Sequence, residues 1–272
     1  MGTWTLDDIP WETFDPARVD PELLKLVKAA SVVEHNGYDY ARYLEGVFKD
    51  DADFGVIARQ WAEEEVQHGK ALARWAGLAD PTYEFEACFA RFTEKIKLPK
   101  GLDSSVRGSR VGELIARCMV EVGTSSYYSA LGAKTDEPVL KEICRRIAAD
   151  EFRHYKMFYS HMKRYLERDR IGFWRRLWVA LDRIGETEDD ELAYAYYATN
   201  HAGEGPYDRE RFTRACIGRA YGLYQPAHLK RGVTMILKAI GIRPGDWMLS
   251  RLADAVYLFM RLRSRIMVRA GA

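Results

Sequence analysis

The sequence predicts an all-α protein, in which a bundle of four long helices is followed by additional peripheral helices. Apolar residues recur at three- and four-residue spacing through two long segments before residue 80 and two more between about 106 and 168. No segment shows the sustained alternation and turn spacing of strands. With 272 residues and 47% hydrophobic content the chain can bury one large core, so we expect a single domain over residues 1–272.

Ordinary helix signals bound the four core helices. Pro21 stands at the start of the first, Gly77 lies near the end of the second, and an acidic residue precedes Pro138 at the start of the fourth. Residues 80–105 mix proline and glycine with aromatic residues, which suits a connection that carries one short helix. The core, about 21–168, is therefore expected to consist of helices over residues 21–48, 54–78, 106–133 and from 136–138 to 168.

Beyond residue 170 the apolar pattern breaks into shorter amphipathic segments, which we expect to pack on the bundle as peripheral helices over about 171–270. The segment after Gly205 carries 13 Lys and Arg residues against four Asp and Glu residues, so it is basic although the whole chain has a formal net charge of only +1. The expected peripheral helices cover residues 173–184, 188–200, 209–221, 228–240 and 246–268.

Composition and the N-terminal sequence argue against an exported or membrane-spanning protein. The four cysteines, Cys88, Cys118, Cys144 and Cys216, form no Cys-x-x-Cys pair and are too sparse for a disulfide framework, so reduced thiols are expected. The N-terminus is acidic and lacks the apolar stretch of a secretory signal, and no window approaches the roughly twenty apolar residues of a membrane span. We expect a soluble, cytoplasmic protein without a nucleic-acid partner.

The motif Glu-x-x-His occurs once in each half of the predicted bundle. Glu65 and His68 lie on the second expected helix, and Glu151 and His154 lie on the fourth. Positions i and i+3 share one helix face, so each carboxylate can converge with its imidazole on one point. Each motif therefore predicts half of a metal site.

A further glutamate stands about thirty residues before each motif, on the preceding helix. Glu34 precedes Glu65, and Glu121 precedes Glu151. The resulting set of four glutamates and two histidines from four helices is the one found in ferritin-like di-iron and di-manganese carboxylate bundles. Four carboxylates neutralise two divalent cations in a buried core. We expect two iron ions, with manganese as the alternative because the ligand types suit both.

The residues around these motifs resemble the soluble acyl-carrier-protein desaturases. The segment from Trp61 to Gly69 (WAEEEVQHG) is similar to the Trp-x-x-Glu-Glu-x-x-His-Gly motif of that family, and residues 147–154 (IAADEFRH) are similar to its second motif, Ile-Ala-x-Asp-Glu-x-Arg-His. The resemblance covers about residues 20–170. It implies that Thr124, three residues after the third-helix glutamate, lies beside the oxygen-binding pocket, and that Asp150 supports a histidine ligand.

The resemblance implies a di-iron, oxygen-dependent oxidoreductase that attacks an unactivated carbon, as in acyl-carrier-protein desaturation. No Gly-x-Gly-x-x-Gly segment follows a predicted strand, so we expect an external electron donor, a ferredoxin or a reductase. Acyl carrier protein is the expected substrate carrier, and a homodimer is expected. A di-iron monooxygenase that hydroxylates or N-oxygenates a small metabolite is the main alternative, and a ferroxidase or peroxide-scavenging protein is a weaker one.

The basic C-terminal region has three interpretations. It could dock an acidic carrier protein, rest peripherally on an anionic membrane, or be a solvated face above a packed apolar one. A separate group of aromatic residues near the expected ligands is interpreted as core packing, without a role in the chemistry. These residues are Tyr38, Tyr127, Tyr128 and Tyr155.

Overall fold

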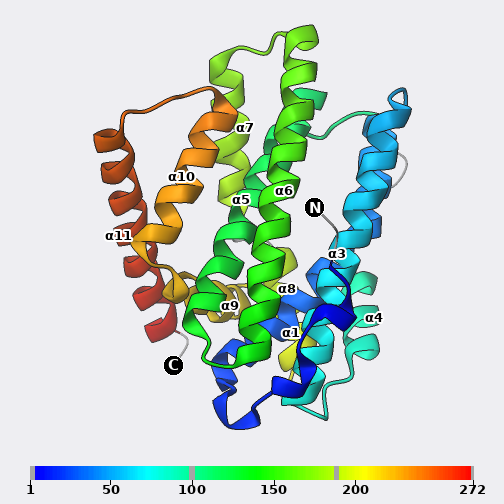
Figure 1. The fold of residues 1–272 in the computed structure, drawn as a ribbon, viewed down its shortest axis with the longest axis vertical. Coiled ribbons are helices and arrows are strands. Elements are labelled where there is room, and N and C mark those ends of the chain that lie inside the picture. The colour runs from blue at the N-terminus through cyan, green and yellow to red at the C-terminus, as the bar shows by residue number, and fades with distance from the viewer. Residues whose placement is uncertain (1–3, 98–101, 187–189, 271–272) are drawn as a thin grey trace.

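Four long helices form the core of the protein in a computed structural model that describes residues 4–97, 102–186 and 190–270. They are α1 (Pro21–His35), α3 (Ala52–Ala79), α5 (Arg110–Lys134) and α6 (Pro138–Asp169). Helix α1 packs against α3, α5 packs against α6, and α3 and α6 join the two pairs (Figure 1). Within the described ranges every long element is an α-helix and none is a strand, which confirms the predicted all-α bundle.

A buried carboxylate fixes the start of α6. The side chain of Glu137 caps the helix by accepting hydrogen bonds from the backbone N–H groups of Val139 and Leu140, and Pro138 occupies the first turn. Glu137 is fully buried, and it also accepts a 2.6 Å hydrogen bond from the Trp75 indole of α3. The cap therefore ties the two halves of the bundle together at one end.

The first predicted helix is divided in two. Sequence periodicity predicted one helix over residues 21–48, but α1 ends at His35 and α2 (Gly37–Val47) begins after Asn36. The break allows close contact with α3. A Cβ atom on Gly37 would lie 2.7 Å from the Cβ of Glu65, and one on Gly69 would lie 2.6 Å from the backbone nitrogen of His35. Two glycines thus bring the end of α1 directly against the middle of α3.

The connection between the two helix pairs contains one short helix, as predicted: α4 (Phe85–Lys95). It packs against α1 and against α8. Three short 3-10 turns precede α1, and the N-terminal segment that carries them crosses the outside of α3 and α6 (Figure 1). These turns are Leu6–Asp8, Trp11–Thr13 and Pro16–Arg18.

The C-terminal third forms two layers around the bundle. Helices α7 and α10 pack against α5, and α8 packs against α1, as predicted for peripheral helices. In contrast, α11 packs against α9 and α10 and forms an outer layer at the edge of the molecule (Figure 1). The bounds of these helices are α7 (Phe173–Gly185), α8 (Asp190–Asn200), α9 (Arg209–Leu223), α10 (Pro226–Ile240) and α11 (Asp246–Ala270).

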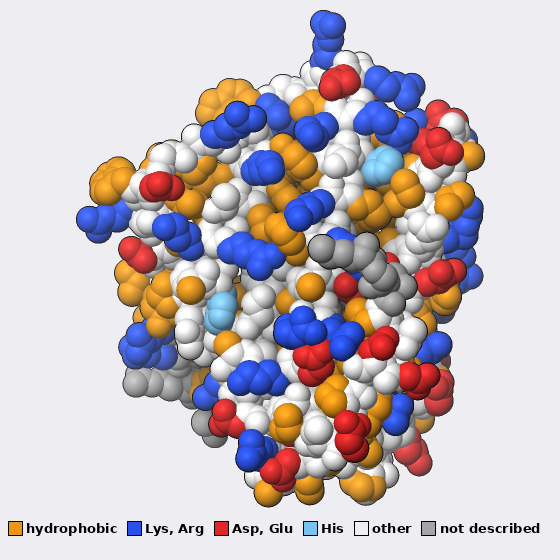
Figure 2. Space-filling view, in the orientation of Figure 1, with side chains coloured by type: hydrophobic (Ala, Val, Ile, Leu, Met, Phe, Trp, Pro, Cys, Tyr) orange, Lys and Arg blue, Asp and Glu red, His pale blue; other side chains and the backbone are white. Residues whose placement is uncertain are grey.

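Helix α11 has apolar residues on two faces. Leu249, Ala253 and Met267 are buried against the rest of the protein, whereas Phe259 and Leu262 are among the apolar side chains left exposed. Figure 2 shows hydrophobic side chains at the edge where α11 lies, and Lys and Arg side chains spread over the face formed by α6 and α10. Among the described helices, none combines the length and apolar content needed to cross a bilayer.

Replacing Gly69 with alanine should destabilise the protein, because the new Cβ atom would overlap the backbone of His35. Overpacking of this kind costs about 1–3 kcal/mol. We expect Gly69→Ala to lower the midpoint of urea unfolding, measured by far-UV circular dichroism.

Gly77→Ala on the same helix is the matched control, because an added Cβ there has no other atom within 4 Å. Alanine is the better helix former by about 0.5–1 kcal/mol, so this variant should be as stable as the parent or more stable. Equal midpoints for the two variants would contradict the close contact between α1 and α3.

Candidate metal centre

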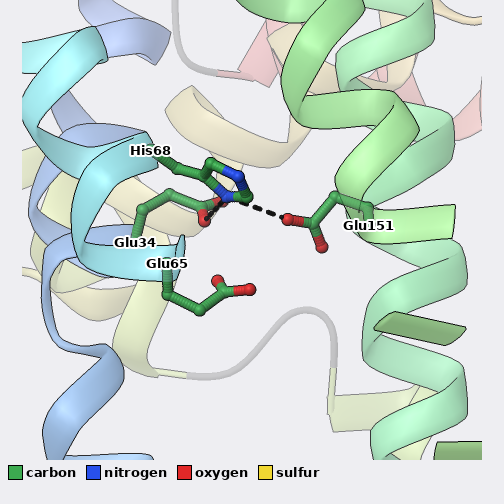
Figure 3. Close-up of side chains that lie close together, drawn as sticks. All are labelled: Glu34, Glu65, His68 and Glu151. Carbon is green, nitrogen blue, oxygen red and sulfur yellow. Dashed lines mark ion pairs between the residues drawn. The ribbon is translucent and has the colours of Figure 1, made fainter. Parts of the chain in front are cut away.

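The Glu-x-x-His motif of α3 meets side chains from both halves of the bundle. Nδ1 of His68 lies 3.5 Å from Oε2 of Glu34 on α1 and 3.2 Å from Oε1 of Glu151 on α6. Glu65, one turn from His68 on α3, points into the same space (Figure 3). Ligand atoms of these four residues all lie within 4.8 Å of one another. They form one candidate metal position.

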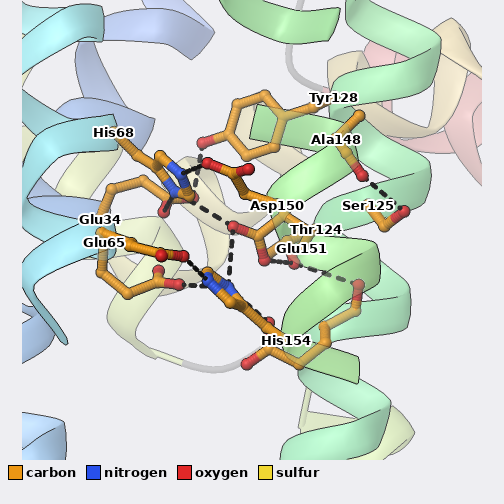
Figure 4. A network of polar contacts seen from close by, with 12 residues as sticks. Glu34, Glu65, His68, Thr124, Ser125, Tyr128, Ala148, Asp150, Glu151 and His154 are labelled. Carbon is orange, nitrogen blue, oxygen red and sulfur yellow. Dashed lines mark hydrogen bonds and ion pairs between the residues drawn. The ribbon is translucent and has the colours of Figure 1, made fainter. Parts of the chain in front are cut away.

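The second motif forms a matching group. Nδ1 of His154 lies 3.0 Å from Oε1 of Glu65 and 3.8 Å from Oε1 of Glu151 (Figure 4). Oε2 of Glu121 lies 3.5 Å from the same nitrogen. Ligand atoms of these four residues also lie within 4.8 Å of one another. Glu65 and Glu151 belong to both groups, so each of them would contribute to both candidate metal positions. The structure thus brings together all six residues that the sequence suggested as ligands.

One polar atom of each of these six residues is buried without a hydrogen-bond partner. Buried polar atoms are rarely left unpaired, because each loses its hydration without compensation. The unpaired atoms of the two groups face one another, and carboxylate oxygens repel unless a cation lies between them. The donor set therefore fits two divalent metal ions. The six atoms are Glu34 Oε2, Glu65 Oε1, His68 Nδ1, Glu121 Oε2, Glu151 Oε1 and His154 Nδ1.

The far nitrogen of each histidine contacts a carboxylate from the opposite motif. Nε2 of His68 lies 3.0 Å from Oδ2 of Asp150, and Nε2 of His154 lies 2.6 Å from Oε2 of Glu64. When Nε2 of each histidine carries the proton that it donates to its carboxylate, Nδ1 keeps a lone pair. That lone pair is directed at the centre. Asp150, which the resemblance implied as the support of a histidine ligand, thus lies against His68. Glu64 was not predicted, although it precedes Glu65 just as Asp150 precedes Glu151.

Arg153 and Trp4 complete the support around the centre. Arg153 donates to both supporting carboxylates, at 3.0 Å to Glu64 and 2.7 Å to Asp150. The indole N–H of Trp4 donates to Asp150 at 2.7 Å, and its ring stacks on His68 with a centroid separation of 6.0 Å. Arg153 lies inside the second motif, but Trp4 comes from the N-terminal segment, where no periodic pattern indicated a role.

Two hydroxyl groups contact the glutamates directly. The hydroxyl of Thr124 on α5 donates to Glu151, so the structure places Thr124 next to a candidate ligand. The phenol of Tyr128 donates to Oε1 of Glu34 at 2.6 Å. Interpreting Tyr128 as packing alone was therefore incomplete. Tyr38, by comparison, is 50% exposed.

Crowding of the carboxylates changes the protonation of the metal-free centre. Burial, together with the charges of Glu151 and Glu34, raises the pKa of Glu65 well above its usual range. Burial and the charge of Glu151 raise the pKa of Glu121 to about 8. Burial alone would lower the pKa of His154, but the nearby carboxylates of Glu121, Glu64 and Glu65 raise it well above its usual range. Protons therefore reduce the repulsion when cations are absent.

A cavity of about 250 Å³ adjoins the centre between the bundle and the C-terminal helices. Glu121 and Thr124 line it from α5, whereas Leu192 of α8 and Ile217 of α9 line the opposite side. Most of its lining is apolar. The C-terminal helices, which the sequence described only as peripheral, thus form a wall of the space beside the candidate metal centre.

One comparison with known proteins identifies a family. A family model described as fatty acid desaturase matches residues 32–179, which is more than half of the chain and includes all six candidate ligands. Among curated proteins, none matches the sequence significantly.

Glu151→Ala should abolish binding of a metal pair, because Glu151 belongs to both four-residue groups. We expect bound iron to fall from about two ions per chain to fewer than about one, measured by elemental analysis. The helix content should be retained, because the substitution removes one of four buried carboxylates that repel one another. Glu167→Ala, an exposed position on the same helix, is the control and should keep both ions. Full iron occupancy in Glu151→Ala would refute the assigned centre.

Metal binding should strengthen as the pH rises. A carboxyl group must lose its proton before it binds a cation, and Glu121 stays largely protonated below its raised pKa of about 8. We expect the affinity for Mn²⁺, measured by titration calorimetry, to increase as the pH rises through about 8, where Glu121 loses its proton. The measured enthalpy should depend on the buffer, because protons are released. An affinity that does not change with pH would contradict the protonation of Glu121 in the metal-free centre.

Proposed function

This chain belongs to the fatty acid desaturase family, and from that membership and the geometry of its buried centre we propose that it is a di-iron, oxygen-dependent oxidoreductase acting on an unactivated C–H bond of an acyl chain. The observation that carries the proposal is the pair of four-residue groups whose unpaired ligand atoms face one another beside an apolar cavity. The six candidate ligands by themselves would also suit an iron-storage protein. The adjoining cavity favours an organic substrate.

Iron is proposed for both metal positions. Glu34 and His68 would hold one ion, Glu121 and His154 would hold the other, and Glu65 and Glu151, which belong to both groups, would contribute to both. Bound iron would supply the redox chemistry for activating dioxygen, which side chains alone cannot provide. Asp150 and Glu64 would keep the two imidazoles oriented, and Arg153 would hold both carboxylates in place.

The protein's own residues would control protons and water near the reacting carbon. The Thr124 hydroxyl is held by Glu151 and borders the cavity, so it can keep a proton beside the substrate. Apolar side chains such as Ile217 and Leu192 would exclude water from the substrate side. The phenol of Tyr128 would fix the orientation of Glu34.

Two partners follow from the proposed reaction. Oxidation of a C–H bond by dioxygen consumes two electrons from outside, and the sequence has no dinucleotide-binding motif, so a ferredoxin or a reductase is proposed as the donor. Acyl carrier protein is proposed as the carrier of the acyl chain, in keeping with the motifs around Glu65 and Glu151. Turnover by the purified protein with NADPH alone would refute the need for a separate donor.

The proposed reaction can be tested by product analysis. Iron-loaded protein is reduced anaerobically and then exposed to oxygen with acyl-carrier, acyl-coenzyme A and free acyl substrates. We expect loss of two hydrogen atoms, which indicates desaturation, and this product should be absent with Glu151→Ala. Gain of one oxygen atom would instead indicate a monooxygenase. Slow oxygen use with growth of an iron mineral, and no change in any substrate, would refute the proposal.

A further inference from the structure

The cavity beside the metal centre follows helix α5 from Arg117 to Tyr128. At about 1.5 Å per residue, these eleven steps correspond to roughly 16 Å along the helix axis. Glu121 and Thr124 lie between the two ends. An extended substrate in this cavity would therefore pass the metal centre with its middle and place its two ends in different surroundings.

One end of the cavity is apolar. Leu26 and Ala30 of α1 line it together with Cys216 and Ala220 of α9. The neighbouring Tyr127 of α5 also contributes to the wall. This end suits a hydrocarbon tail.

The opposite end is polar, but its carboxylates are already engaged. Glu186 accepts a 2.8 Å hydrogen bond from Arg107, and Glu191 accepts one from Tyr40. Both glutamates line the cavity near Arg117. They accept their hydrogen bonds from protein groups rather than from the guanidinium of Arg117.

Arg117 is buried at this end without a hydrogen bond to satisfy it. Its exposed fraction is 9%, and its Nε is enclosed without a partner. The nearest carboxylate oxygen, on Glu113, lies 3.8 Å from Nε, which is beyond hydrogen-bond distance. A guanidinium carries five N–H donors, and across the described residues no hydrogen bond is donated by Arg117. Its donors remain available to a molecule in the cavity.

The surroundings of Arg117 favour a neutral acceptor over an anion. Glu113, one turn earlier on α5, is itself buried and offsets the charge of the guanidinium. The ring of Tyr40 lies on another side, with its centroid 5.2 Å from the guanidinium carbon. Glu113 balances the charge of Arg117, and the N–H donors of Arg117 are unused. A carbonyl oxygen can accept hydrogen bonds from these donors without adding a second buried negative charge.

We propose that Arg117 binds the carbonyl oxygen of the substrate's acyl head group and thereby determines which carbon of the chain lies beside Thr124. This inference rests on the proposed function, because it assumes an acyl substrate in the cavity. Arg117 lies one helical turn from Glu121, and its side chain leans toward the N-terminus of α5, away from the centre. The oxidised carbon is then several bonds from the carbonyl. A thioester and a free acid both carry this oxygen, and the charge balance favours the thioester.

Binding of matched probes tests the contact without turnover. S-octanoyl-pantetheine, S-octyl-pantetheine and octanoate are titrated by calorimetry into iron-loaded protein under anaerobic conditions. The octyl compound has the same chain but no carbonyl oxygen. We expect the octanoyl compound to bind roughly tenfold or more tightly than the octyl compound. Arg117→Met should remove this preference, whereas Arg145→Met, a matched change at an exposed position of α6, should keep it.

Equal binding of the octanoyl and octyl compounds to the parent protein would overturn the proposal, whatever the variants do. A full preference in Arg117→Met would overturn it as well. Tighter, Arg117-dependent binding of octanoate would support the carbonyl contact and identify a free acid as its source.

Product analysis separates this inference from the proposed function. In a turnover assay, Arg117→Met should shift or spread the position of oxidation along the chain, which loss of stability alone would not do. An unchanged position in that variant would overturn the proposal. Arg117-dependent binding without oxidation of any acyl substrate would refute the proposed reaction and leave the binding site standing.

Discussion

Repulsion among four buried carboxylates is the constraint on which the structure depends. Glu34, Glu65, Glu121 and Glu151 lie almost completely out of solvent, with one oxygen of each turned toward the others. Such an arrangement is unfavourable unless protons or cations occupy the space between the oxygens. The bundle must therefore hold the glutamates in place, and the contacts that do so recur throughout the core.

The same contacts join the two halves of the bundle. Each motif supplies the carboxylate that supports the histidine of the other, so His68 depends on Asp150 of α6 and His154 depends on Glu64 of α3. Arg153 connects both carboxylates. The contacts that pack α3 against α6 are therefore the same contacts that orient the ligands. On the other side, Gly69 lets the end of α1 approach closely enough for Glu34 to reach His68.

The residues that sequence could identify are those whose roles follow from local helix geometry. Glu65 with His68, and Glu151 with His154, stand one turn apart on predicted helices, and the repeat pointed to Glu34 and Glu121. The break at Asn36 was not predictable, because it depends on contact between Gly37 and a helix distant in sequence. Trp4 and the cavity wall formed by α8 and α9 likewise depend on tertiary packing. Glu64 could have been found by comparing the two motifs position by position.

We infer that the buried centre binds two metal ions between α1, α3, α5 and α6, with Glu65 and Glu151 contributing to both positions. Crystals of iron-loaded protein, measured on both sides of the iron absorption edge, would locate the metal directly. We expect two neighbouring anomalous peaks per chain, one beside Nδ1 of His68 and one beside Nδ1 of His154. A single peak, or peaks away from these nitrogens in a crystal with full iron content, would contradict this inference.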